Sequence, residues 1–540
     1  MTPTTLRRFR LAGSAFIPAL AFAATGISAQ TANIGTGPTP IARATALRQG
    51  DVITGVLPAA QPIHIEVALK LRSRPLLDAA VAAGRTIDPA QFDAVHAPTI
   101  EQAQAVAAYL IRSGFTNVVI APNRMLVSAD GAAANARAAF LTTISRVQTK
   151  EGRVAFANDS DAFIPAELQG SVLSVIGLQT VNVAHSLAIS TQVIRGPAVA
   201  GHNPIEFAAI YGATGVPTAA GVTVGIITVG DLSQTIMDLN TFTANNGLPT
   251  VATETINTGG TSGDTSGVDE WNLDSQTIVG TAGGRVGKII FYNVPSFLNT
   301  ALVADFNKVV TDNVAKIINV SLGECETSAQ NDGSAAATDQ ILAAGVAQGQ
   351  TFAFATGDSG ANECAPFPGI KPSWPASSPY GVAIAGTTLN ANATTWNGEV
   401  VWNNPGNGAT GGSPSTFEPK PSWQNALVPG TKRGVADVAF DASPYSGANV
   451  VYFGGIAQIG GTSLAAPIFS GLWARVIALK GTSVGFAAPL LYQLPATDFH
   501  DVTYGNNNGE TAGPGYDFAT GRGSIILSRA VTHIPASIAK

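Results

Sequence analysis

The strongest constraint on the fold is a regular alternation of apolar strands and helices between residues 222 and 355. Short runs rich in Val, Ile and Phe are separated by helical stretches of ten or more residues. The expected strands are residues 222–229, 288–292, 316–322 and 351–355, and the expected helices are residues 233–245, 270–281, 299–314 and 335–348. Parallel strands joined through helices are buried on both faces. The sequence therefore predicts an α/β domain with a parallel sheet sandwiched by helices.

A different pattern occupies residues 50–180. The expected strands are residues 63–69, 117–121 and 124–128, and the expected helices are residues 75–83, 99–113 and 132–144. Thr99 is expected to cap the second helix, which should bury Ala105, Val106, Tyr109 and Leu110. This pattern predicts a small α+β domain with paired helices on an antiparallel sheet. On fold grounds alone it could also be a substrate-binding or adaptor domain.

The amino terminus has the pattern of a secretory signal. Arg7, Arg8 and Arg10 precede an apolar run over residues 11–24, and small residues follow near Ala29. The run is too short for a membrane span and contains Pro18. We predict a signal peptide over residues 1–29, with residues 21–23 as a second possible cleavage site and the export route left open. No later stretch is expected to be long and apolar enough to span a bilayer, so we expect a soluble, secreted product.

Two cysteines, Cys325 and Cys364, follow this signal. In an exported chain two cysteines favour a disulfide over two free thiols. Cys364 comes shortly after residues 357–360, a Gly-Asp-Ser-Gly turn, so the bridge is expected to brace that turn.

The charge balance argues against a nucleic-acid partner. Charged residues make up 12% of the chain and the net charge is −6. Only 13 of the 29 Lys and Arg residues lie at or beyond residue 197. Few basic groups limit charge repulsion when carboxylates are protonated, so this composition suits a protein that works in acid.

A nucleophile candidate stands where a glycine-rich turn meets an apolar helix. Gly460, Gly461 and Thr462 precede Ser463, and residues 464–479 form a long apolar helical run. The free N–H groups and positive end of a helix stabilise an alkoxide or oxyanion. Taken alone, the pattern is more typical of an ordinary helix cap than of a nucleophile. Ser463 needs a proton acceptor to act as a nucleophile.

Carboxylates are the available acceptors. None of the six histidines lies in a recognisable catalytic context, whereas Glu270 and Asp274 are spaced i and i+4 on a predicted helix. The apolar neighbours Trp271 and Leu273 indicate that this helix is buried, which would raise the carboxyl pKa values and let the pair share a proton. The alternative is a solvated polar face.

A third acid follows the expected strand 351–355. Asp358 lies in the turn after that strand, at the sheet edge where catalytic groups of parallel α/β folds gather. A protonated aspartic acid there could donate a hydrogen bond to a developing oxyanion. An Asx-turn is the structural alternative.

These residues, in this order along the chain, resemble the sedolisins, or serine-carboxyl peptidases, and most closely the pseudomonalisin-type bacterial branch. Matching motifs occur at residues 201–204, 225–228, 270–280, 319–323, 373–379, 461–467 and 471–475. The resemblance implies a subtilisin-like catalytic fold and an endopeptidase that acts on proteins or peptides. It implies Ser463 as nucleophile, Glu270 as general base, Asp274 as the acid that orients Glu270, and Asp358 as oxyanion donor.

The resemblance also implies one calcium ion per catalytic domain. Read from the residues alone, the segment 500–517 is a turn-rich loop whose acids cap the backbone. By resemblance, Asp501 and Asp517 would be side-chain ligands, and Val502, Gly513 and Gly515 would bind through their carbonyl oxygens. His500 would be a structural neighbour.

The resemblance divides the chain into a signal peptide (1–29), a ferredoxin-like propeptide (30–196) and a catalytic domain (197–540). The propeptide would inhibit the enzyme and help it fold. Residues 194–203, rich in Gly and Pro, read as a linker, and we expect the propeptide to be cut within residues 190–204. We expect a monomer without nucleic-acid or membrane partners.

Three other classes of protein compete with this interpretation. An aspartic protease needs two Asp-Ser/Thr-Gly turns in a bilobal β-protein, and Asp264 is wrongly spaced to supply the second. A subtilisin with a Ser-His-Asp triad needs a catalytic histidine, and this chain has none in a recognisable catalytic context. A non-catalytic binding protein on the same fold would be expected to have lost one of the four candidate residues, and all four are present.

Overall fold

The structure is a computed structural model that describes residues 40–190 and 201–535. The expected signal peptide and its cleavage sites lie outside the described residues, as do residues 194–200 of the expected linker. The described residues belong to one compact unit that has a larger and a smaller half.

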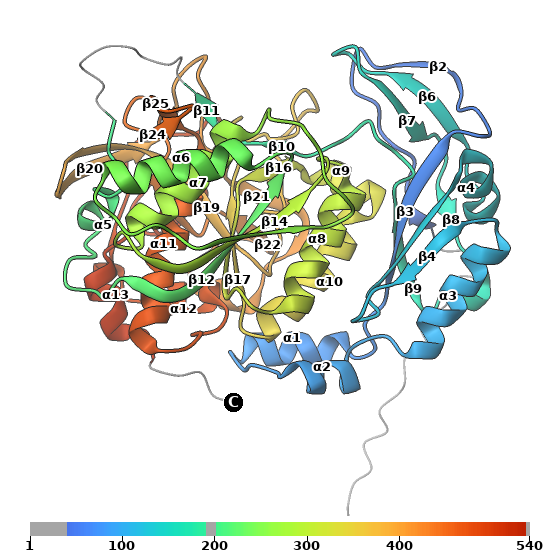
Figure 1. Cartoon of the computed structure of the whole chain (residues 1–540), viewed down its shortest axis with the longest axis horizontal. Helices are drawn as coiled ribbons and strands as arrows, with labels where there is room; N and C mark the ends of the chain where they lie inside the picture. Colours follow the sequence, from blue (N-terminus) through green and yellow to red (C-terminus); the bar gives the residue numbers. More distant parts are fainter. Residues whose placement is uncertain (1–39, 191–200, 536–540) are drawn as a thin grey trace, which may run out of the picture. The chain divides into compact units, whose positions relative to one another are not determined.

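A sheet of eight strands forms the centre of the larger half (Figure 1). Its path is β13-β14-β12-β15-β17-β19-β20, with β23 pairing to β19. The bounds are Thr253–Asn257, Val286–Val294, Ala219–Val229, Ile317–Val320, Thr351–Ala355, Val382–Asn392 and Thr395–Val401 along the path, and Val438–Asp441 for β23. Every pairing is parallel except β19 with β20. The predicted parallel sheet is confirmed.

Helices cover both faces of this sheet. The helices are α6 (Ser233–Asn245), α7 (Val268–Thr281), α8 (Asn299–Asp312), α10 (Ser334–Ala347) and α11 (Thr462–Lys480). Alternate residues of a strand face opposite sides. On β17 the rings of Phe352 and Phe354 pack on Phe306 of α8. Ala353, between these two rings in the sequence, faces the other side of the sheet, and so does its partner on β15, Asn319. Asn319 accepts a hydrogen bond from Ser470 of α11. Helices α8 and α11 therefore lie on opposite faces.

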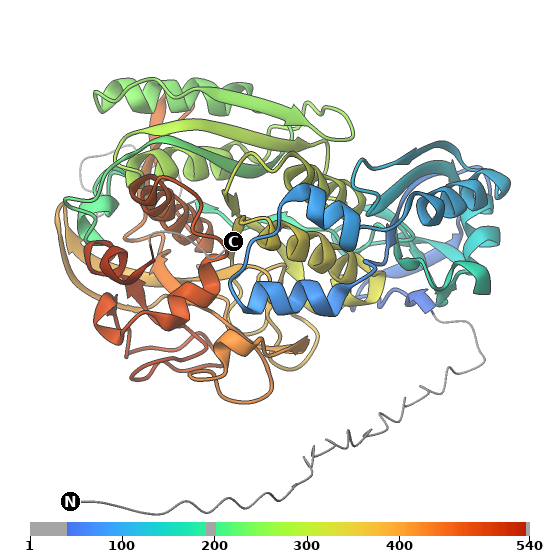
Figure 2. The same cartoon turned by 90° about the horizontal axis from the view of Figure 1, so that it is seen from below.

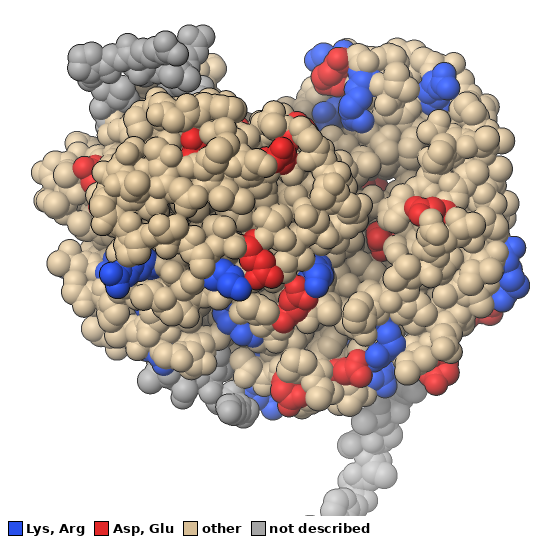
Figure 3. Space-filling model, viewed as in Figure 1, with Lys and Arg blue, Asp and Glu red and all other residues tan. Residues whose placement is uncertain are grey.

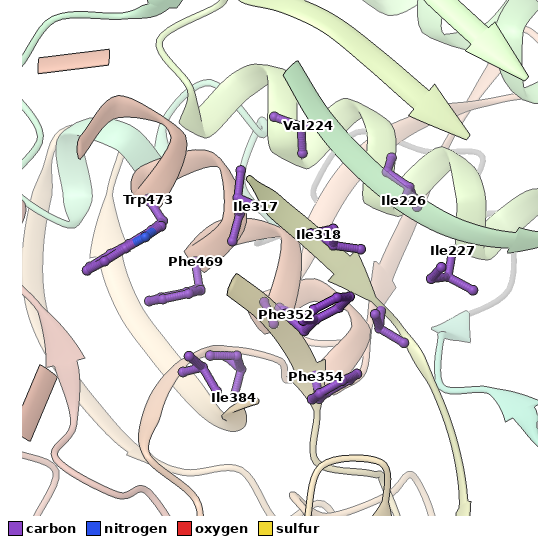
Figure 4. Close-up of a cluster of buried hydrophobic side chains, with 14 of the residues drawn as sticks. Val224, Ile226, Ile227, Ile317, Ile318, Phe352, Phe354, Ile384, Phe469 and Trp473 are labelled. Carbon is purple, nitrogen blue, oxygen red and sulfur yellow. The ribbon is translucent and has the colours of Figure 1, made fainter. Parts of the chain in front are cut away.

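The apolar alternation in the sequence fills the interior on both sides. Figure 4 shows Ile318, Phe352 and Phe354 from neighbouring strands together with Phe469 and Trp473 of α11, and all five are buried. Such burial is the main favourable contribution to folding.

Helix α11 contradicts the expectation that no stretch after the signal is long and apolar enough to span a membrane. Its hydropathy reaches 1.4 over an 18-residue window, so by length and composition it could span a membrane. The expectation that no later stretch is apolar enough was wrong. However, 89% of that window is buried inside the protein, as expected for a core helix.

The smaller half is built on a four-stranded antiparallel sheet of order β4-β5-β3-β9. The strands are Thr116–Ile120, Leu126–Ala132, Pro62–Leu69 and Val172–Ile176, in that order. Its helices are α1 (Arg74–Ala82), α2 (Pro89–Val95), α3 (Ile100–Arg112) and α4 (Ala133–Phe140), and α1 and α2 are adjacent in both views (Figures 1 and 2). The βαββαβ order and this strand arrangement are ferredoxin-like, as predicted.

Two details of that half differ from the sequence prediction. Helix α4 ends at Phe140 rather than near residue 144, because Leu141 adopts a left-handed conformation and Ile144 begins strand β6 (Ile144–Gln148). Thr99 caps α3 as expected, but the buried face contains Ala103 with Val106 and Leu110, whereas Ala105 is exposed.

Polar contacts join the two halves. Gln340 on α10 accepts a hydrogen bond from the Leu71 backbone at 2.8 Å. Arg74 donates to the Tyr380 hydroxyl at 2.6 Å, and Gln179 donates to Asp332 at 2.8 Å. The ferredoxin-like half therefore has specific contacts with the α8–α10 side of the larger half.

The predicted disulfide is present between Cys325 and Cys364. Cys325 ends strand β16 (Leu322–Cys325), and Cys364 follows the turn that contains Asp358. A bridge of this kind contributes roughly 2–4 kcal/mol by restricting the unfolded chain.

The outer surface carries few charges. On the face in Figure 3, acidic and basic side chains are interspersed among uncharged residues. This distribution gives no basic patch on that face of the kind that nucleic acids require.

Candidate active site

Ser463 is the second residue of α11 and is fully buried. The helix begins after Gly461, whose φ of +100° is a conformation that residues with a Cβ rarely adopt. A Cβ on Gly461 would also lie 2.7 Å from Asp358 Oδ2. Glycine at this position therefore lets the chain turn sharply and brings Ser463 next to the sheet edge.

Glu270 lies in the first turn of α7 and meets Ser463 directly. The Ser463 hydroxyl donates to Glu270 Oε2 at 2.9 Å, and both side chains are fully buried. Burial, and next the negative charge of Asp274, raise the pKa of Glu270 well above its usual value. A carboxylate at this distance can accept the serine proton, and its raised pKa makes it a stronger base than an ordinary carboxylate.

Asp274, one turn further along α7, is held by a chain of polar side chains. Ser321 donates to Asp274 Oδ1 at 2.7 Å, and Asn319 donates to the Ser321 hydroxyl at 3.0 Å. Ser470 of α11 in turn donates to Asn319 at 3.1 Å. Burial raises the pKa of Asp274, while the hydrogen bond from Ser321 opposes that shift.

Asp358 is tied to the residue before the nucleophile. The backbone N–H and the hydroxyl of Thr462 donate to Asp358 Oδ1 at 2.8 and 2.9 Å. Its other oxygen, Oδ2, is buried and makes no hydrogen bond within the described residues. Burial raises the pKa of Asp358 to about 7. A protonated Oδ2 would be a hydrogen-bond donor without a partner, which is what an oxyanion site requires.

Glu363 is a neighbour that the sequence did not single out. Its Oε1 accepts from the Ser359 backbone at 2.8 Å, and its carboxyl lies so close to Gly357 that a Cβ there would be 2.2 Å away. Burial and then the charge of Asp358 raise the pKa of Glu363 well above its usual value. The charge of Asp358 therefore adds to burial in keeping Glu363 protonated.

Histidine takes no part in this arrangement. Within the described chain, the Ser463 hydroxyl makes hydrogen bonds only to Glu270 and, at 3.5 Å, to the Ser321 carbonyl. The His500 ring stacks on Trp396 with centroids 3.8 Å apart, as expected for a structural neighbour. Carboxylates are therefore the bases available to Ser463.

The structure also brings together the predicted calcium residues. Asp501 Oδ2 accepts from the Gly515 backbone at 2.9 Å, and Asp517 Oδ2 accepts from the Gly513 backbone at 3.1 Å. The carbonyl oxygens of Val502, Gly513 and Gly515 accept no hydrogen bond within the described residues. No cluster of three or more His, Cys, Asp or Glu side chains that could hold a metal occurs in the described ranges.

Comparisons with known proteins agree with this geometry. Residues 49–181 match the family "Pro-kumamolisin, activation domain", and residues 260–486 match the subtilase family. Sedolisin of Pseudomonas sp. (strain 101) is 44% identical over 518 residues, which cover 88% of each chain. Xanthomonalisin of Xanthomonas sp. (strain T-22) is 42% identical over 551 residues, covering 89% of this chain and 66% of the relative.

A solved structure supports the same assignment. Pseudomonas sedolisin, described as a serine-carboxyl proteinase complexed with two molecules of pseudo-iodotyrostatin, is 46% identical and aligns with a TM-score of 0.60. The alignment covers 62% of this chain and 98% of that structure. The predicted subtilisin-like catalytic fold and serine-type peptidase class are confirmed, and the aspartic-protease and binding-protein alternatives are not supported. The chain belongs to the sedolisin family of serine-carboxyl peptidases, with an activation domain ahead of its catalytic domain.

Proposed function

We propose that this protein is an exported endopeptidase that works in acid and is made as a self-processing proenzyme. Residues 1–29 serve as the signal peptide, residues 30–196 as the propeptide and residues 197–540 as the catalytic domain of a secreted monomer. The observation that carries the enzymatic part is the 2.9 Å hydrogen bond from the buried Ser463 hydroxyl to Glu270.

Each acid has a distinct role in the proposed reaction. Glu270 accepts the Ser463 proton as the hydroxyl adds to the peptide carbonyl, and returns it to the leaving amine. Asp274 orients Glu270, and its negative charge raises the pKa of Glu270 and so makes it a stronger proton acceptor. Asp358, protonated at Oδ2, donates to the oxyanion of the tetrahedral intermediate. The product is an acyl-enzyme on Ser463, which water then hydrolyses with Glu270 as base.

Changing Asp358 to Asn tests the oxyanion role. The amide keeps the contacts with Thr462, but its N–H is a weaker donor than a carboxylic acid O–H and it cannot exchange a proton. We expect kcat to fall roughly 10²–10³-fold at the acid optimum, as for removal of an oxyanion donor. The measurement is steady-state hydrolysis of a peptide by the processed enzyme.

Asp305→Asn is a matched control for that substitution. Asp305 is another buried carboxyl whose pKa burial raises to about 7, and it binds Thr258 rather than any residue of the site. Its variant should retain kcat within about threefold of wild type. Equal kcat for Asp358→Asn and Asp305→Asn would remove Asp358 from the reaction.

We further propose one calcium ion in the loop of Asp501 and Asp517. The fit rests on two carboxylates and three backbone carbonyl oxygens, a donor set typical of calcium. The backbone N–H groups of Gly513 and Gly515 donate to Asp517 and Asp501, so both carboxylates lie against the segment 513–515. The three carbonyl oxygens accept no hydrogen bond within the described residues. The ion would stabilise this loop and supply no step of the reaction.

Chelation is expected to lower the Tm of the processed enzyme and to speed its self-digestion. Calcium that binds only the folded state adds about 2.7 kcal/mol at a hundredfold excess over Kd. Asp517→Ala should lower the Tm similarly and abolish its response to chelator, whereas Glu254→Ala, which breaks an exposed pair with Lys288, should change neither. The test is a melting curve with and without chelator, together with elemental analysis. Identical curves and no bound calcium would remove the ion from the proposal.

A further inference from the structure

The segment that links the two halves crosses the active site as two short strands. Strand β10 (His185–Ser186) pairs antiparallel with β16, with His185 opposite Gly323. Strand β11 (Ile189–Ser190) pairs antiparallel with β25 (Gly455–Gly460), with Ile189 opposite Gly460. Strand β25 ends three residues before Ser463. The two residues between these pairings, Leu187 and Ala188, therefore lie at the nucleophile.

The backbone of Leu187 makes its contacts with the catalytic groups themselves. Its N–H donates to Glu270 Oε2 at 2.8 Å, the same oxygen that accepts the Ser463 hydroxyl at 2.9 Å. The N–H also lies 3.3 Å from the Ser321 carbonyl oxygen. One face of the Leu187 peptide unit is thus held beside the nucleophile and its base.

The carbonyl oxygen of Leu187 points to the oxyanion donor. A Cβ on Gly461 would lie 2.2 Å from this oxygen and 2.7 Å from the unpartnered Oδ2 of Asp358. Both oxygens therefore border the same small space above Gly461. The Leu187 N–H thus contacts the base of the nucleophile, and the Leu187 carbonyl oxygen borders the buried donor, which is the orientation that attack by Ser463 requires.

The Leu187 side chain is buried among the apolar residues of the main core. It is 3% exposed, and its Cδ1 lies 3.5 Å from the Cβ position of Gly323. On the other side of the bond, Ile189 Cδ1 lies 2.7 Å from the Cβ position of Gly408. A side chain at Gly408 would collide with Ile189 and with Trp402, so glycine there lets residue 189 pack closely on the catalytic half.

From these contacts we propose that the peptide bond between Leu187 and Ala188 is the first bond that the enzyme cuts in its own chain. The site that holds Leu187 would be the pocket for the residue before the scissile bond, with a preference for Leu-sized aliphatic side chains. This inference rests on the proposed catalytic function. It places the first cut upstream of the window of residues 190–204 expected from the sequence, and residues 188–196 would remain on the catalytic fragment after this cut.

The reaction needs no reagent except water. Ser463 Oγ bonds to the Leu187 carbonyl carbon and its proton passes to Glu270. The bond from that carbon to the Ala188 nitrogen breaks, and Glu270 returns the proton to the nitrogen, which leaves as the amine of a new chain start. Water then adds to the acyl carbon, and Leu187 departs with a free carboxyl group while Ser463 regains its hydrogen.

A time course of the full-length proprotein after transfer to acid tests the position of the cut. Intact-mass measurement and amino-terminal sequencing should show that the earliest catalytic fragment begins at Ala188. Its rate of formation should not change on tenfold dilution, because the bond is held in the same molecule's site. A first fragment that begins at any other residue would overturn the inference.

Variants of Leu187 test the pocket. In Leu187→Asp a polar group would enter an apolar site, so the first cut should slow by about 100-fold. Leu187→Met, which conserves apolar volume, should stay within about threefold of wild type. Equal rates of the first cut in the two variants would refute the proposed pocket for an aliphatic side chain.

A separate peptide substrate distinguishes failure of this inference from failure of the proposed function. Leu187→Asp protein, processed by a trace of active wild-type enzyme, should hydrolyse that peptide with wild-type kcat/KM. A wild-type enzyme that cuts the peptide but begins its own fragment elsewhere would overturn only the Leu187–Ala188 assignment. A wild-type protein that hydrolyses no peptide at any acid pH would overturn both.

Discussion

Ser463→Ala is expected to abolish peptide hydrolysis and to leave the proprotein at full length after acid incubation. The substitution removes the hydroxyl that shares Glu270 Oε2 with the Leu187 N–H, while Glu270, Asp274 and Asp358 remain. Loss of the nucleophile in a serine protease costs about 10⁶-fold in kcat. The measurements are peptide turnover and intact mass over the same time course.

Ser275→Ala provides the matched control. Ser275 is also fully buried and lies next to Asp274 on α7, but its hydroxyl donates to the Trp271 carbonyl of its own helix at 2.7 Å. This variant should process and turn over peptide at close to the wild-type rate. Self-processing of Ser463→Ala protein expressed in a protease-free host would count against Ser463 as the nucleophile.

Much of the fold could be predicted because apolar periodicity determines which faces are buried. Strand β17 and helix α6 begin and end at the residues expected from the sequence. The predicted helix over 132–144 was too long because its alanine-rich composition gives no stop signal. The left-handed conformation of Leu141, which ends the helix, has no marker such as glycine in the sequence.

The four candidate catalytic residues could be selected from the sequence because their spacing and neighbours suggested chemistry, and the structure places them together. The residues that position them could not be selected. Ser321, Asn319 and Ser470 have side chains common in any protein, and only tertiary contact joins them into the chain that holds Asp274. Glu363 likewise becomes relevant only because the turn at Gly357 brings it beside Asp358.

The two short strands within residues 185–190 could not be predicted from the sequence either. The glycine and proline content of residues 194–203 predicted a linker there. Strands β10 and β11 have two residues each, which is too short to show the alternation that predicts a strand. Their pairing with β16 and β25 depends on edges that exist only in the folded domain.

Activity is expected to be greatest in acid and to be lost as pH rises through about 7. Catalysis needs the Glu270–Asp274 pair to have lost one proton, so that Glu270 can accept another from Ser463. It also needs Asp358 to keep its proton, and burial places the pKa of Asp358 at about 7. Ionisation of Asp358 above that pH would put a negative charge where the oxyanion must form. The acid limb reports the pair as a whole, because the two carboxyls titrate together.

The pH dependence of kcat/KM for the processed enzyme tests the carboxylate mechanism most directly, because it reports the essential groups of the free enzyme. The mechanism predicts a bell with its maximum in the acid range and hydrolysis close to background at pH values well above the Asp358 pKa of about 7. In Asp358→Asn the alkaline limb set by Asp358 should disappear, while the acid limb of the Glu270–Asp274 pair should remain. A wild-type maximum near pH 7 to 8, the range in which a neutral histidine base operates, would contradict the mechanism.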